Sequence, residues 1–430
     1  MADVAGKQRV TVLGGGAGGL ELAVGLSRRH DLDVTLVDRV STHLWKPRLH
    51  EFAAGTVNSS LAEMSFYTLA GMHGFRFEQG DVETIDRAAK TIRLAEMRDA
   101  NDHFVTTGRS LAYDACVVAL GGLTATFDTE GVAEHAIRLD EKSDAEEFRD
   151  LFIAMMIHAR VSREPAHVVI VGSGATGTEL AAHLRLSEQA FAHERGSDEM
   201  RPLLKLTILE AAPQLMPGAD DGLRKSVSDR LDQLDIVVRT NAAVDRVGAS
   251  EIRIKTGEVF PADVTVWAAG LTGHPRLKQL ADFEIDKKGR IVVDDRLRSS
   301  IDPAIFVIGD AASFTPEGAE APLPPTAQCA SQQADYLVSA LPELLAGGTP
   351  KPFVYNDRGR LLSLGGAGSV GLVGFLRKND FLVEGRFATA AYHGLQRRHQ
   401  WSVLGPLRGS VAILADMISP TAGPALKLHG

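Results

Sequence analysis

Three glycines near the start of the chain have the spacing that binds the pyrophosphate of a dinucleotide. Gly14, Gly16 and Gly19 fit the pattern G-x-G-x-x-G, directly after a short apolar run. In this pattern the first glycine permits a tight turn, the second lets a pyrophosphate approach the backbone, and the third lets helix and strand pack closely. Asp38 follows about 20 residues later, where a carboxylate can accept hydrogen bonds from a ribose 2′-hydroxyl. The stretch therefore predicts a strand–turn–helix unit that binds a dinucleotide.

The same pattern recurs in the middle of the chain, at Gly172, Gly174 and Gly177. A predicted strand precedes it, a predicted helix follows, and the next strand ends at Glu210, at a longer interval because of the polar insertion 187–202. Glu210 favours a free 2′-hydroxyl and no arginine follows it at once, which favours NADH over NADPH. A purely structural glycine-rich turn is the alternative at either place, although two complete patterns in one chain make it the weaker one.

Composition limits the classes of protein to which this chain can belong. With 430 residues it is long enough for two or three domains, and its net charge of −9 disfavours a nucleic-acid partner. The two cysteines, Cys116 and Cys329, are too few and too far apart for a disulfide framework or a zinc site, and no metal is expected. The N-terminus lacks the apolar region of a signal peptide, and no uncharged stretch is long enough to span a bilayer.

Three further predicted strands run into small residues, at Gly121, Gly270 and Gly309, where a cofactor could lie against the backbone. Asp310 follows the last of them. An acid at the carboxyl end of a parallel strand lies where open α/β sheets bind ligands, so Asp310 could hold a sugar-alcohol hydroxyl; the alternative is an aspartate that caps a turn. The alternation of strands and helices predicts an α/β fold with two Rossmann-like domains.

The C-terminal part of the chain combines a predicted helix with an unusual tail. Thr326 is the predicted N-cap of a helix from Ala327 to about Leu341. The tail 376–430 carries seven basic and three acidic side chains in an otherwise acidic protein, and apolar residues recur along it at helical spacing. This pattern predicts an amphipathic helix at a membrane surface or at a dimer interface, and a solvated charged face is the remaining alternative.

Taken together, these motifs resemble those of the bacterial type II NADH dehydrogenases, the single-subunit NADH:quinone oxidoreductases of the two-dinucleotide-domain flavoproteins. The resemblance runs nearly end to end, through GGGAGGLELA, LVDRVSTHLWKPRLHE, AAGTV, VALGG, VGSGATGTELAAHL, VWAAGL, FVIGDAAS, PPTAQCASQQA and LKLHG. It implies that the first glycine pattern holds FAD and that an inserted second domain holds NADH. It also implies that an AQ-x-A-x-Q segment, here Ala327, Gln328, Ala330 and Gln332, lines a quinone pocket beside the flavin.

Three catalytic candidates follow from this resemblance. Gln328 and Gln332 lie one helical turn apart on one face and are expected to hydrogen-bond a quinone oxygen. The N-terminus of the helix near Ala327 would stabilise negative charge on the reduced flavin. The resemblance places Glu179 near the nicotinamide, where it could orient the carboxamide or relay a proton. A plain acid in the first turn of a helix, favoured by the helix dipole, is the alternative for Glu179.

The candidate cofactor-binding residues extend beyond the glycine patterns. They are Gly14, Gly16, Ala17, Gly18, Gly19, Asp38, Arg39, Lys46, Val82, Ala119, Gly121, Gly309, Asp310, Ala327, Gln328, Gly172, Gly174, Gly177, Glu179, Glu210 and Gly270.

Four positions depart from the usual family pattern. Thr326 stands where arginine is common, Ser331 where histidine is common, Gly122 where serine is common and Ala311 where cysteine is common. Two of the four lie in the quinone segment, and they bear on the electron acceptor more than on the cofactors.

The expected organisation is an FAD-binding domain interrupted by an NADH-binding domain and followed by a small C-terminal amphipathic region. The predicted boundaries are 1–163 and 289–348 for the FAD domain, 164–288 for the NADH domain and 349–430 for a region of membrane association or dimerisation. The expected activity is FAD-dependent oxidation of NADH followed by reduction of a membrane quinone, ubiquinone or menaquinone, without proton pumping. The protein is expected peripherally on the cytoplasmic side of the cell membrane, or in the cytoplasm, with a homodimer as one possibility.

Three alternative functions share the cofactor motifs. A soluble, diaphorase-like NADH:acceptor reductase would differ only in lacking a membrane role for the tail. A sulfide:quinone oxidoreductase would need cysteines over the flavin, and only Cys329 lies near the predicted flavin segment. A non-enzymatic NADH-sensing flavoprotein would reoxidise very slowly with any quinone. The lack of a cysteine pair before Cys116 already disfavours a dithiol relay to another protein.

Overall fold

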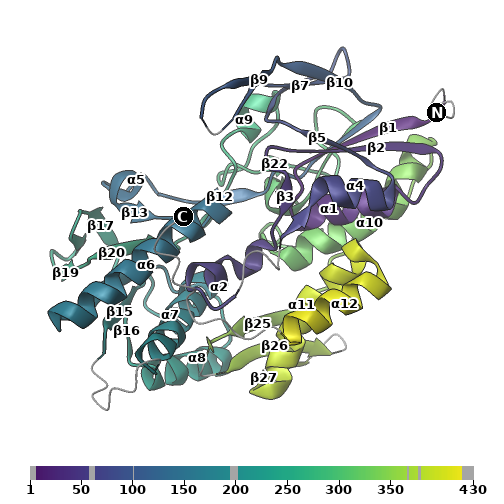
Figure 1. The fold of residues 1–430 in the computed structure, drawn as a ribbon. Coiled ribbons are helices and arrows are strands. Elements are labelled where there is room, and N and C mark those ends of the chain that lie inside the picture. The colour runs from purple at the N-terminus through teal and green to yellow at the C-terminus, as the bar shows by residue number, and fades with distance from the viewer. Residues whose placement is uncertain are drawn as a thin grey trace.

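The computed structural model describes most of the chain (Figure 1). The described residues are 6–57, 63–99, 101–193, 202–365, 368–375 and 379–418. Part of the polar insertion, the basic pair Arg377 and Lys378, and the closing LKLHG segment lie outside them.

A five-stranded parallel sheet with the strand order β23-β11-β1-β2-β5 forms the first Rossmann-like unit. Its strands are β1 (Gln8–Leu13), β2 (Leu32–Asp38), β5 (Arg76–Gln79), β11 (Ala115–Val118) and β23 (Ile305–Val307). Strands β1, β2, β11 and β23 are largely apolar and buried, as a parallel sheet covered by helices requires, whereas the edge strand β5 is partly exposed. Helix α1 (Ala17–Leu26) packs beside α10 (Ala327–Leu345), which returns to the sheet from far along the chain (Figure 1).

A second five-stranded parallel sheet with the order β13-β20-β14-β15-β16 forms the other unit. Its strands are β13 (Ala136–Ile137), β14 (Ala166–Val171), β15 (Leu204–Leu209), β16 (Ile236–Arg239) and β20 (Val264–Trp267), accompanied by helices α6 (Lys142–Ser162), α7 (Ala175–His193) and α8 (Asp221–Gln233). All its strands lie between β11 and β23 in the sequence, so this unit is an insertion into the first. The predicted α/β class is confirmed, whereas the exact domain boundaries stay a prediction.

Smaller helices and strands complete the two units. Those of the first unit are β3 (Thr42–His43), η1 (Lys46–Arg48), α2 (Leu49–Ala53), β4 (Met64–Ser65), α4 (Phe66–His73), β6 (Val82–Asp86), β7 (Thr91–Leu94), β8 (Met97–Arg98), β9 (Phe104–Thr106) and β10 (Arg109–Ala112). The others are β12 (Gly122–Thr124), α5 (Val132–His135), β17 (Val244–Val247), β18 (Glu251–Ile254), β19 (Val259–Pro261), β21 (Leu271–Gly273), α9 (Leu277–Leu280), β22 (Ile291–Val292), η2 (Gly309–Ala311) and β24 (Ala312–Ser313).

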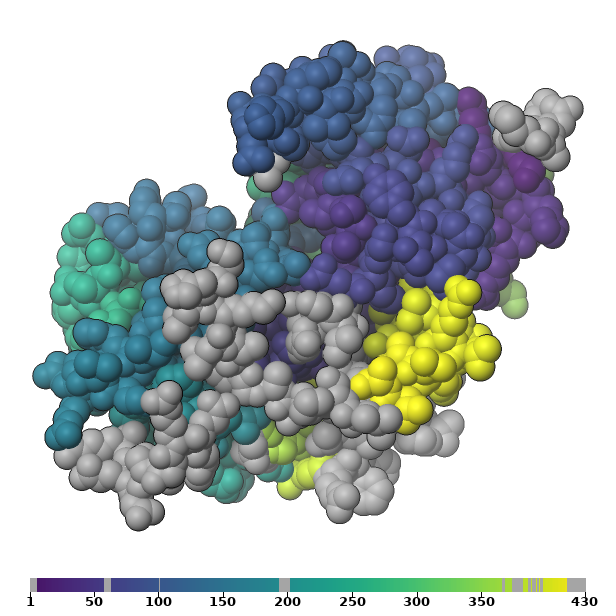
Figure 2. All heavy atoms as spheres, viewed as in Figure 1, coloured from purple at the N-terminus to yellow at the C-terminus, as the bar shows by residue number. Residues whose placement is uncertain are grey.

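The C-terminal part adds a three-stranded antiparallel sheet and two helices. They are β25 (Gly359–Ser363), β26 (Ser369–Phe375), β27 (Asn379–Glu384), α11 (Arg386–Leu404) and α12 (Pro406–Ile418). The helices form the yellow segment at the surface in Figure 2, against the purple N-terminal unit. Within the described ranges, no helix is long and apolar enough to cross a membrane.

Two helices extend beyond their sequence-based limits because tertiary packing covers the extra turns. Helix α10 continues past Leu341 and through Pro342 to Leu345, because Leu344 and Leu345 pack against the main hydrophobic core. The extra burial offsets the hydrogen bond that a proline removes. Helix α7 continues into the polar insertion, where Phe191 is buried and the guanidinium of Arg160 lies 3.9 Å from the centre of its ring.

Candidate functional site

The first glycine-rich turn follows β1 and is shaped by contacts that only glycine allows. Gly14 has φ of +106°, and a Cβ built there would lie 2.3 Å from the carbonyl oxygen of Ala119. A Cβ on Gly19 would lie 1.9 Å from the carbonyl oxygen of Gly14, so α1 packs directly on the turn. Gly16, in contrast, faces open space, with nothing within 4 Å of its Cβ position. The turn is closed on the protein side and open on the other.

Asp38, at the end of β2, holds this turn in place. Its carboxylate accepts hydrogen bonds from the backbone N–H of Gly15 at 2.6 Å and of Val40 at 3.0 Å. Burial raises the pKa of Asp38, and these two hydrogen bonds to the charged form oppose that rise. A carboxylate has about four lone-pair sites, so the side chain can accept further hydrogen bonds. The neighbouring Arg39 forms an ion pair with Glu141, at the start of α6.

The second glycine-rich turn, after β14, repeats this construction. Gly172 has φ of +104°, and its Cβ would lie 2.8 Å from the carbonyl oxygen of Ala268. A Cβ on Gly177 would lie 2.1 Å from the carbonyl oxygen of Gly172. Gly174 again has nothing within 4 Å of its Cβ position. Both units therefore have one glycine for backbone conformation, one for packing and one that leaves a surface open.

Glu210, at the end of β15, takes the place that Asp38 has in the first unit. One carboxylate oxygen accepts hydrogen bonds from the backbone N–H of Ser173 at 2.9 Å and from its hydroxyl at 2.6 Å. The other oxygen accepts one from the N–H of Ala212 at 2.8 Å. Glu210 is only 8% exposed. In both units an acid at the end of the second strand is therefore bound to the second residue of the glycine-rich turn.

Both turns fit a bound dinucleotide. Among the described residues, no side chain caps the N-terminus of α1, whose N-cap is Gly16. A helix N-terminus offers unpaired backbone N–H groups and a partial positive charge, which favour a phosphate. The open Cβ positions at Gly16 and Gly174 leave room for a phosphate to approach the backbone. Ala17, in the first turn of α1, is partly exposed, whereas Gly18 is buried and its Cβ position lies 2.9 Å from the carbonyl oxygen of Ala330, so its predicted cofactor contact stays a prediction.

The carboxyl ends of β11 and β23 bring more of the predicted residues together. Lys46 donates a hydrogen bond from Nζ to the carbonyl oxygen of Gly122 at 3.0 Å. Burial raises the pKa of Asp310, and the positive charge of Lys46 opposes this rise. The N–H of Gly309 donates to Oε1 of Gln333 at 2.7 Å. Gln333 is 1% exposed and was not predicted, since nothing in its local sequence separates it from its neighbour Gln332.

The start of α10 agrees with the capping prediction but gives its glutamines unexpected partners. Thr326 caps the helix by accepting a hydrogen bond from the N–H of Cys329 at 3.2 Å, which confirms its predicted role. The amide of Gln328 donates to the hydroxyl of Tyr355 at 3.1 Å and accepts from the N–H of Arg358 at 3.0 Å. Both ends of this amide are therefore bound to a segment between α10 and β25.

Gln332 holds the same segment. Its Nε2 donates to the carbonyl oxygen of Asn356 at 2.8 Å, and its Oε1 accepts from the N–H of the same residue at 2.9 Å. The side-chain amides of the two glutamines therefore hold residues 355–358 against α10 by hydrogen bonds. Their predicted contact with an electron acceptor stays a prediction.

Glu179, in the first turns of α7, is buried between the two units. Its Oε1 accepts a hydrogen bond from the N–H of Ser363 at 2.8 Å, and its Oε2 lies 3.9 Å from Nδ1 of His50. Burial raises the pKa of Glu179 well above its ordinary range, with a smaller contribution from the charge of Glu51. Burial therefore favours the protonated carboxyl, and a solvated acid in the first turn of a helix does not describe this residue.

A buried polar cluster that the sequence did not reveal surrounds Glu179. Arg48 and Glu51 form an ion pair of 2.7 Å, and the hydroxyl of Tyr392 donates to Glu51 at 3.1 Å. The ring of His50 meets that of His183 edge-on, and burial lowers the pKa of His50 to about 3. These residues come from η1, α2, α7 and α11. No fixed spacing links them, so only the tertiary structure could assemble the cluster.

The remaining predicted residues lie outside these contacts. Val82 lies in β6 and is buried in the hydrophobic core. Gly270 has φ of +71°, and its Cβ position lies 2.4 Å from the ring of Phe127. Both stay predictions as cofactor contacts.

The buried thiols of Cys116 and Cys329 are unpaired, and burial raises the pKa of Cys329 to about 12. A reactive cysteine has a lowered pKa instead, so that its thiol ionises to the thiolate. In the parts of the chain that are described, no group of side chains is suited to a metal ion.

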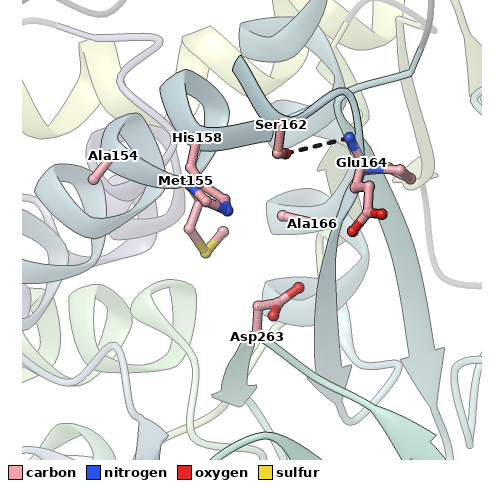
Figure 3. A pocket seen from close by; sticks show the side chains of 8 residues that line it. Ala154, Met155, His158, Ser162, Glu164, Ala166 and Asp263 are labelled. Atoms are coloured by element: carbon pink, nitrogen blue, oxygen red, sulfur yellow. Dashed lines mark hydrogen bonds between the residues drawn. The ribbon is translucent and has the colours of Figure 1, made fainter. Parts of the chain in front are cut away.

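A cavity of about 360 Å³, shown in Figure 3, has no residue of either glycine-rich turn in its lining. It is lined by Ala154, Met155, His158, Ser162, Glu164, Pro165, Ala166 and Asp263. Ala166 begins β14 and Asp263 directly precedes β20, so the cavity is at the amino edge of the second sheet. Ligands of open α/β sheets bind at the carboxyl edge, so this cavity is not part of the dinucleotide site.

Comparisons with known proteins agree with this geometry. The sequence pattern of a family described as pyridine nucleotide-disulphide oxidoreductase matches residues 8–334. A type II NADH:quinone oxidoreductase from Haemophilus influenzae is 33% identical, covering 98% of this chain and 100% of that protein. One from Mycobacterium tuberculosis is 30% identical, over 96% and 91% of the two chains. The structure of NDH2 from Plasmodium falciparum in complex with NADH has a TM-score of 0.79 at 18% identity, over 97% and 99% of the chains.

The contrast between the glycines within one turn can be tested directly. Gly16→Ala should fold normally, because its Cβ would meet open space, yet it should weaken dinucleotide binding by about tenfold or more, since the methyl group occupies the face open to the phosphate. Gly14→Ala should instead lower the free energy of unfolding by about 1–3 kcal/mol, because its φ is positive. Thermal unfolding and dinucleotide titration measure the two effects.

Gly174→Ala serves as a matched control in the second turn. It should leave the first dinucleotide bound and weaken only the second, because its Cβ position is equally open. Unchanged affinity in both Gly16→Ala and Gly174→Ala would show that the phosphates do not approach these glycines.

Proposed function

We propose that this chain, which belongs to the pyridine nucleotide-disulphide oxidoreductase family and within it to the type II NADH:quinone oxidoreductases, oxidises NADH and reduces a quinone. The observation that carries the proposal is the duplicated arrangement of glycine-rich turn and strand-end acid, which provides two dinucleotide sites in one chain. The first turn holds FAD and the second holds NADH. Bound FAD supplies the chemistry that accepts a hydride and returns electrons to an acceptor.

The side chains of this protein bind and orient the cofactors. Asp38 and Glu210 each keep lone pairs free beside their turns, and these accept hydrogen bonds from the ribose hydroxyls. Because Glu210 is a buried acid, a 2′-phosphate at the second site meets negative charge, which selects NADH over NADPH. The N-terminus of α10, together with Lys46, provides positive potential at the carboxyl edge of the first sheet.

Burial of Glu179 at the junction of the two units raises the pKa of its carboxyl and favours the protonated form. Its buried carboxyl is fixed through Oε1 by the N–H of Ser363, which leaves Oε2 directed toward His50. A neutral acid at this position can donate a hydrogen bond to the nicotinamide carboxamide, or pass its proton on during reduction of the acceptor.

The buried thiols support a quinone as acceptor over sulfur chemistry. A sulfide-oxidising site needs reactive thiolates, and burial raises the pKa of Cys329, the cysteine in the first turn of α10. Cys116 is in β11, completely buried within the sheet. We therefore retain NADH:quinone oxidoreduction and set the sulfide-dependent alternative aside. The quinone, ubiquinone or menaquinone, is reached at a membrane surface.

The C-terminal helices provide the surface for that membrane contact. Four large apolar side chains are exposed on α11 and α12, and we call them the C-terminal apolar surface: Trp401, Leu407, Val411 and Leu414, at 51%, 79%, 62% and 56% exposure. Arg408, the chain neighbour of Leu407, is also exposed. Exposed apolar side chains next to a cation suit an interfacial helix that lies on anionic lipid. We place the protein peripherally on the cytoplasmic side of the cell membrane, with homodimerisation as the competing use of this surface.

The proposed activity is tested by anaerobic stopped-flow mixing of the yellow protein with NADH or NADPH, followed by quinone. NADH should bleach the flavin absorbance and a quinone should restore it, and NADPH should react far more slowly because Glu210 repels its 2′-phosphate. Equal kcat/KM for the two nucleotides would overturn the assignment of Glu210. A bleached flavin that no quinone reoxidises would favour an NADH sensor over an enzyme.

The acceptor side can be separated from the NADH side with Gln332→Leu. This change removes both hydrogen bonds to Asn356 and should slow reoxidation of the flavin by quinone by about tenfold, a loss of roughly 1.4 kcal/mol. Bleaching by NADH should stay near the wild-type rate. Ser339→Ala, on the exposed face of the same helix, is the matched control and should change neither step. Equal slowing of both steps would place Gln332 outside an acceptor site.

Membrane binding is tested by changing Trp401, Leu407, Val411 and Leu414 together to serine. The variant should keep its flavin and lose flotation with anionic vesicles, because it removes the exposed apolar area and leaves Arg408 in place. Val354→Ser, which changes an apolar side chain of 71% exposure elsewhere, is the control and should still float. If the quadruple variant loses a dimer in sedimentation while flotation is unchanged, the surface is a dimer interface instead.

A further inference from the structure

A continuous line of hydrogen bonds connects the C-terminal helix α11 with the first glycine-rich turn. The Nε2 atoms of His399 and His43 lie 2.9 Å apart, and Nδ1 of His43 lies 2.8 Å from the carbonyl oxygen of Gly15. On the other side, Nδ1 of His399 lies 2.7 Å from Oε1 of Glu21. The second oxygen of Glu21 accepts a hydrogen bond of 2.5 Å from the hydroxyl of Ser331.

This line is closed to water. His43 and His399 are each 2% exposed, and the side chain of Glu21 is 7% exposed. The indole of Trp45 lies against the ring of His399, with centroids 4.2 Å apart. The members come from β3, α11, α1 and α10, which are distant in the sequence. A buried polar chain of this kind is stable only if every hydrogen bond in it is satisfied.

Counting hydrogens fixes how the chain is protonated. A carbonyl oxygen at one end and a carboxylate at the other both accept, so the three contacts between Gly15, His43, His399 and Glu21 need three hydrogens. Two neutral imidazoles supply only two. The chain therefore holds one additional proton. Because the carbonyl oxygen of Gly15 can only accept, His43 must carry a hydrogen on Nδ1.

The additional proton belongs to the pair of His399 and Glu21. Burial, with a contribution from the charge of His399, lowers the pKa of His43 to about 3, so His43 is neutral. Its Nε2 is then an acceptor, and His399 must donate to it. The third hydrogen lies between Nδ1 of His399 and Oε1 of Glu21.

The end of this chain is the peptide that leads into Gly16. The N–H of Gly15 is held by Asp38 and its carbonyl oxygen by His43, so both sides of the residue are fixed. The ring of Phe66 packs against the same residue, where a Cβ would lie 2.3 Å away. Any rotation of this peptide would move the N–H groups that face the open side of the turn.

We propose that His399 is a positioning residue for FAD: from the C-terminal helix it fixes His43, which holds the carbonyl of Gly15 and with it the glycine-rich turn. The inference rests on the proposed function only in that FAD occupies the first turn. The C-terminal helix, in addition to any membrane contact, then takes part in retaining the cofactor. Ser331, which stands where histidine is common in the family, is part of the same hydrogen-bonded chain, because its hydroxyl donates to the remaining oxygen of Glu21.

The test measures release of FAD from the full-length protein by the rise in free flavin fluorescence after dilution. His399→Leu should release FAD about tenfold faster or more, because His43 loses its buried partner. Arg398→Ala is the matched control: this neighbour on α11 also bonds to α10, through an exposed ion pair of 2.6 Å with Asp335, and should release FAD like the wild type. Equal release rates in His399→Leu and Arg398→Ala would overturn the proposal.

A second pair of variants separates this role from general damage to the fold. Glu21→Gln should retain FAD far better than Glu21→Leu, because an amide N–H supplies the third hydrogen and its oxygen still accepts from Ser331. Equal losses in both would contradict the hydrogen count. In the wild type, ¹⁵N resonances of the histidine rings should show His43 with hydrogen on Nδ1; a hydrogen on Nε2 alone would also overturn the chain. A wild-type protein that binds no FAD would instead refute the proposed function.

Discussion

A strand-end carboxylate that hydrogen-bonds the backbone of a glycine-rich turn is the constraint on which both halves of this structure depend. Asp38 holds Gly15, and Glu210 holds Ser173, each from the end of the strand beside the turn. Glu210 is buried and Asp38 is partly so, and a carboxylate withdrawn from water in this way is stable only when its oxygens are satisfied, for which the turn provides donors. The same contacts fix the turn and leave its other face open, so the requirement of folding and the requirement of ligand binding coincide.

The second unit is inserted in the first, and a buried polar cluster lies where they meet the C-terminal sheet. The ion pair of Arg48 and Glu51 comes from the first unit, Glu179 from the second and Tyr392 from the C-terminal helix. Charges removed from water in this way are costly unless they are paired, so the parts must meet in one arrangement. The cluster thus joins the two units to the C-terminal part and sets the environment of Glu179.

Helix α11 presents two very different faces. His399 is buried against the first unit, whereas Trp401, two positions later, is half exposed. Two residues are about 200° apart around a helix, so neighbouring positions can serve opposite sides. One face of α11 therefore closes a hydrogen-bonded chain that ends at the first glycine-rich turn, and the other contributes to the C-terminal apolar surface. This arrangement connects the two proposed roles of the tail within a single element.

The sequence by itself determined the two strand–turn–helix units, their strand-end acids and the cap at Thr326, because each depends on residues close together in the chain. It also gave the α/β class, since the glycine patterns and apolar strands are local signals. Only the tertiary structure decided that Gln332 binds Asn356, and that His43 meets His399 across 356 positions. Such contacts have no period or spacing in the sequence. They arise because buried polar groups must find partners wherever the fold brings them together.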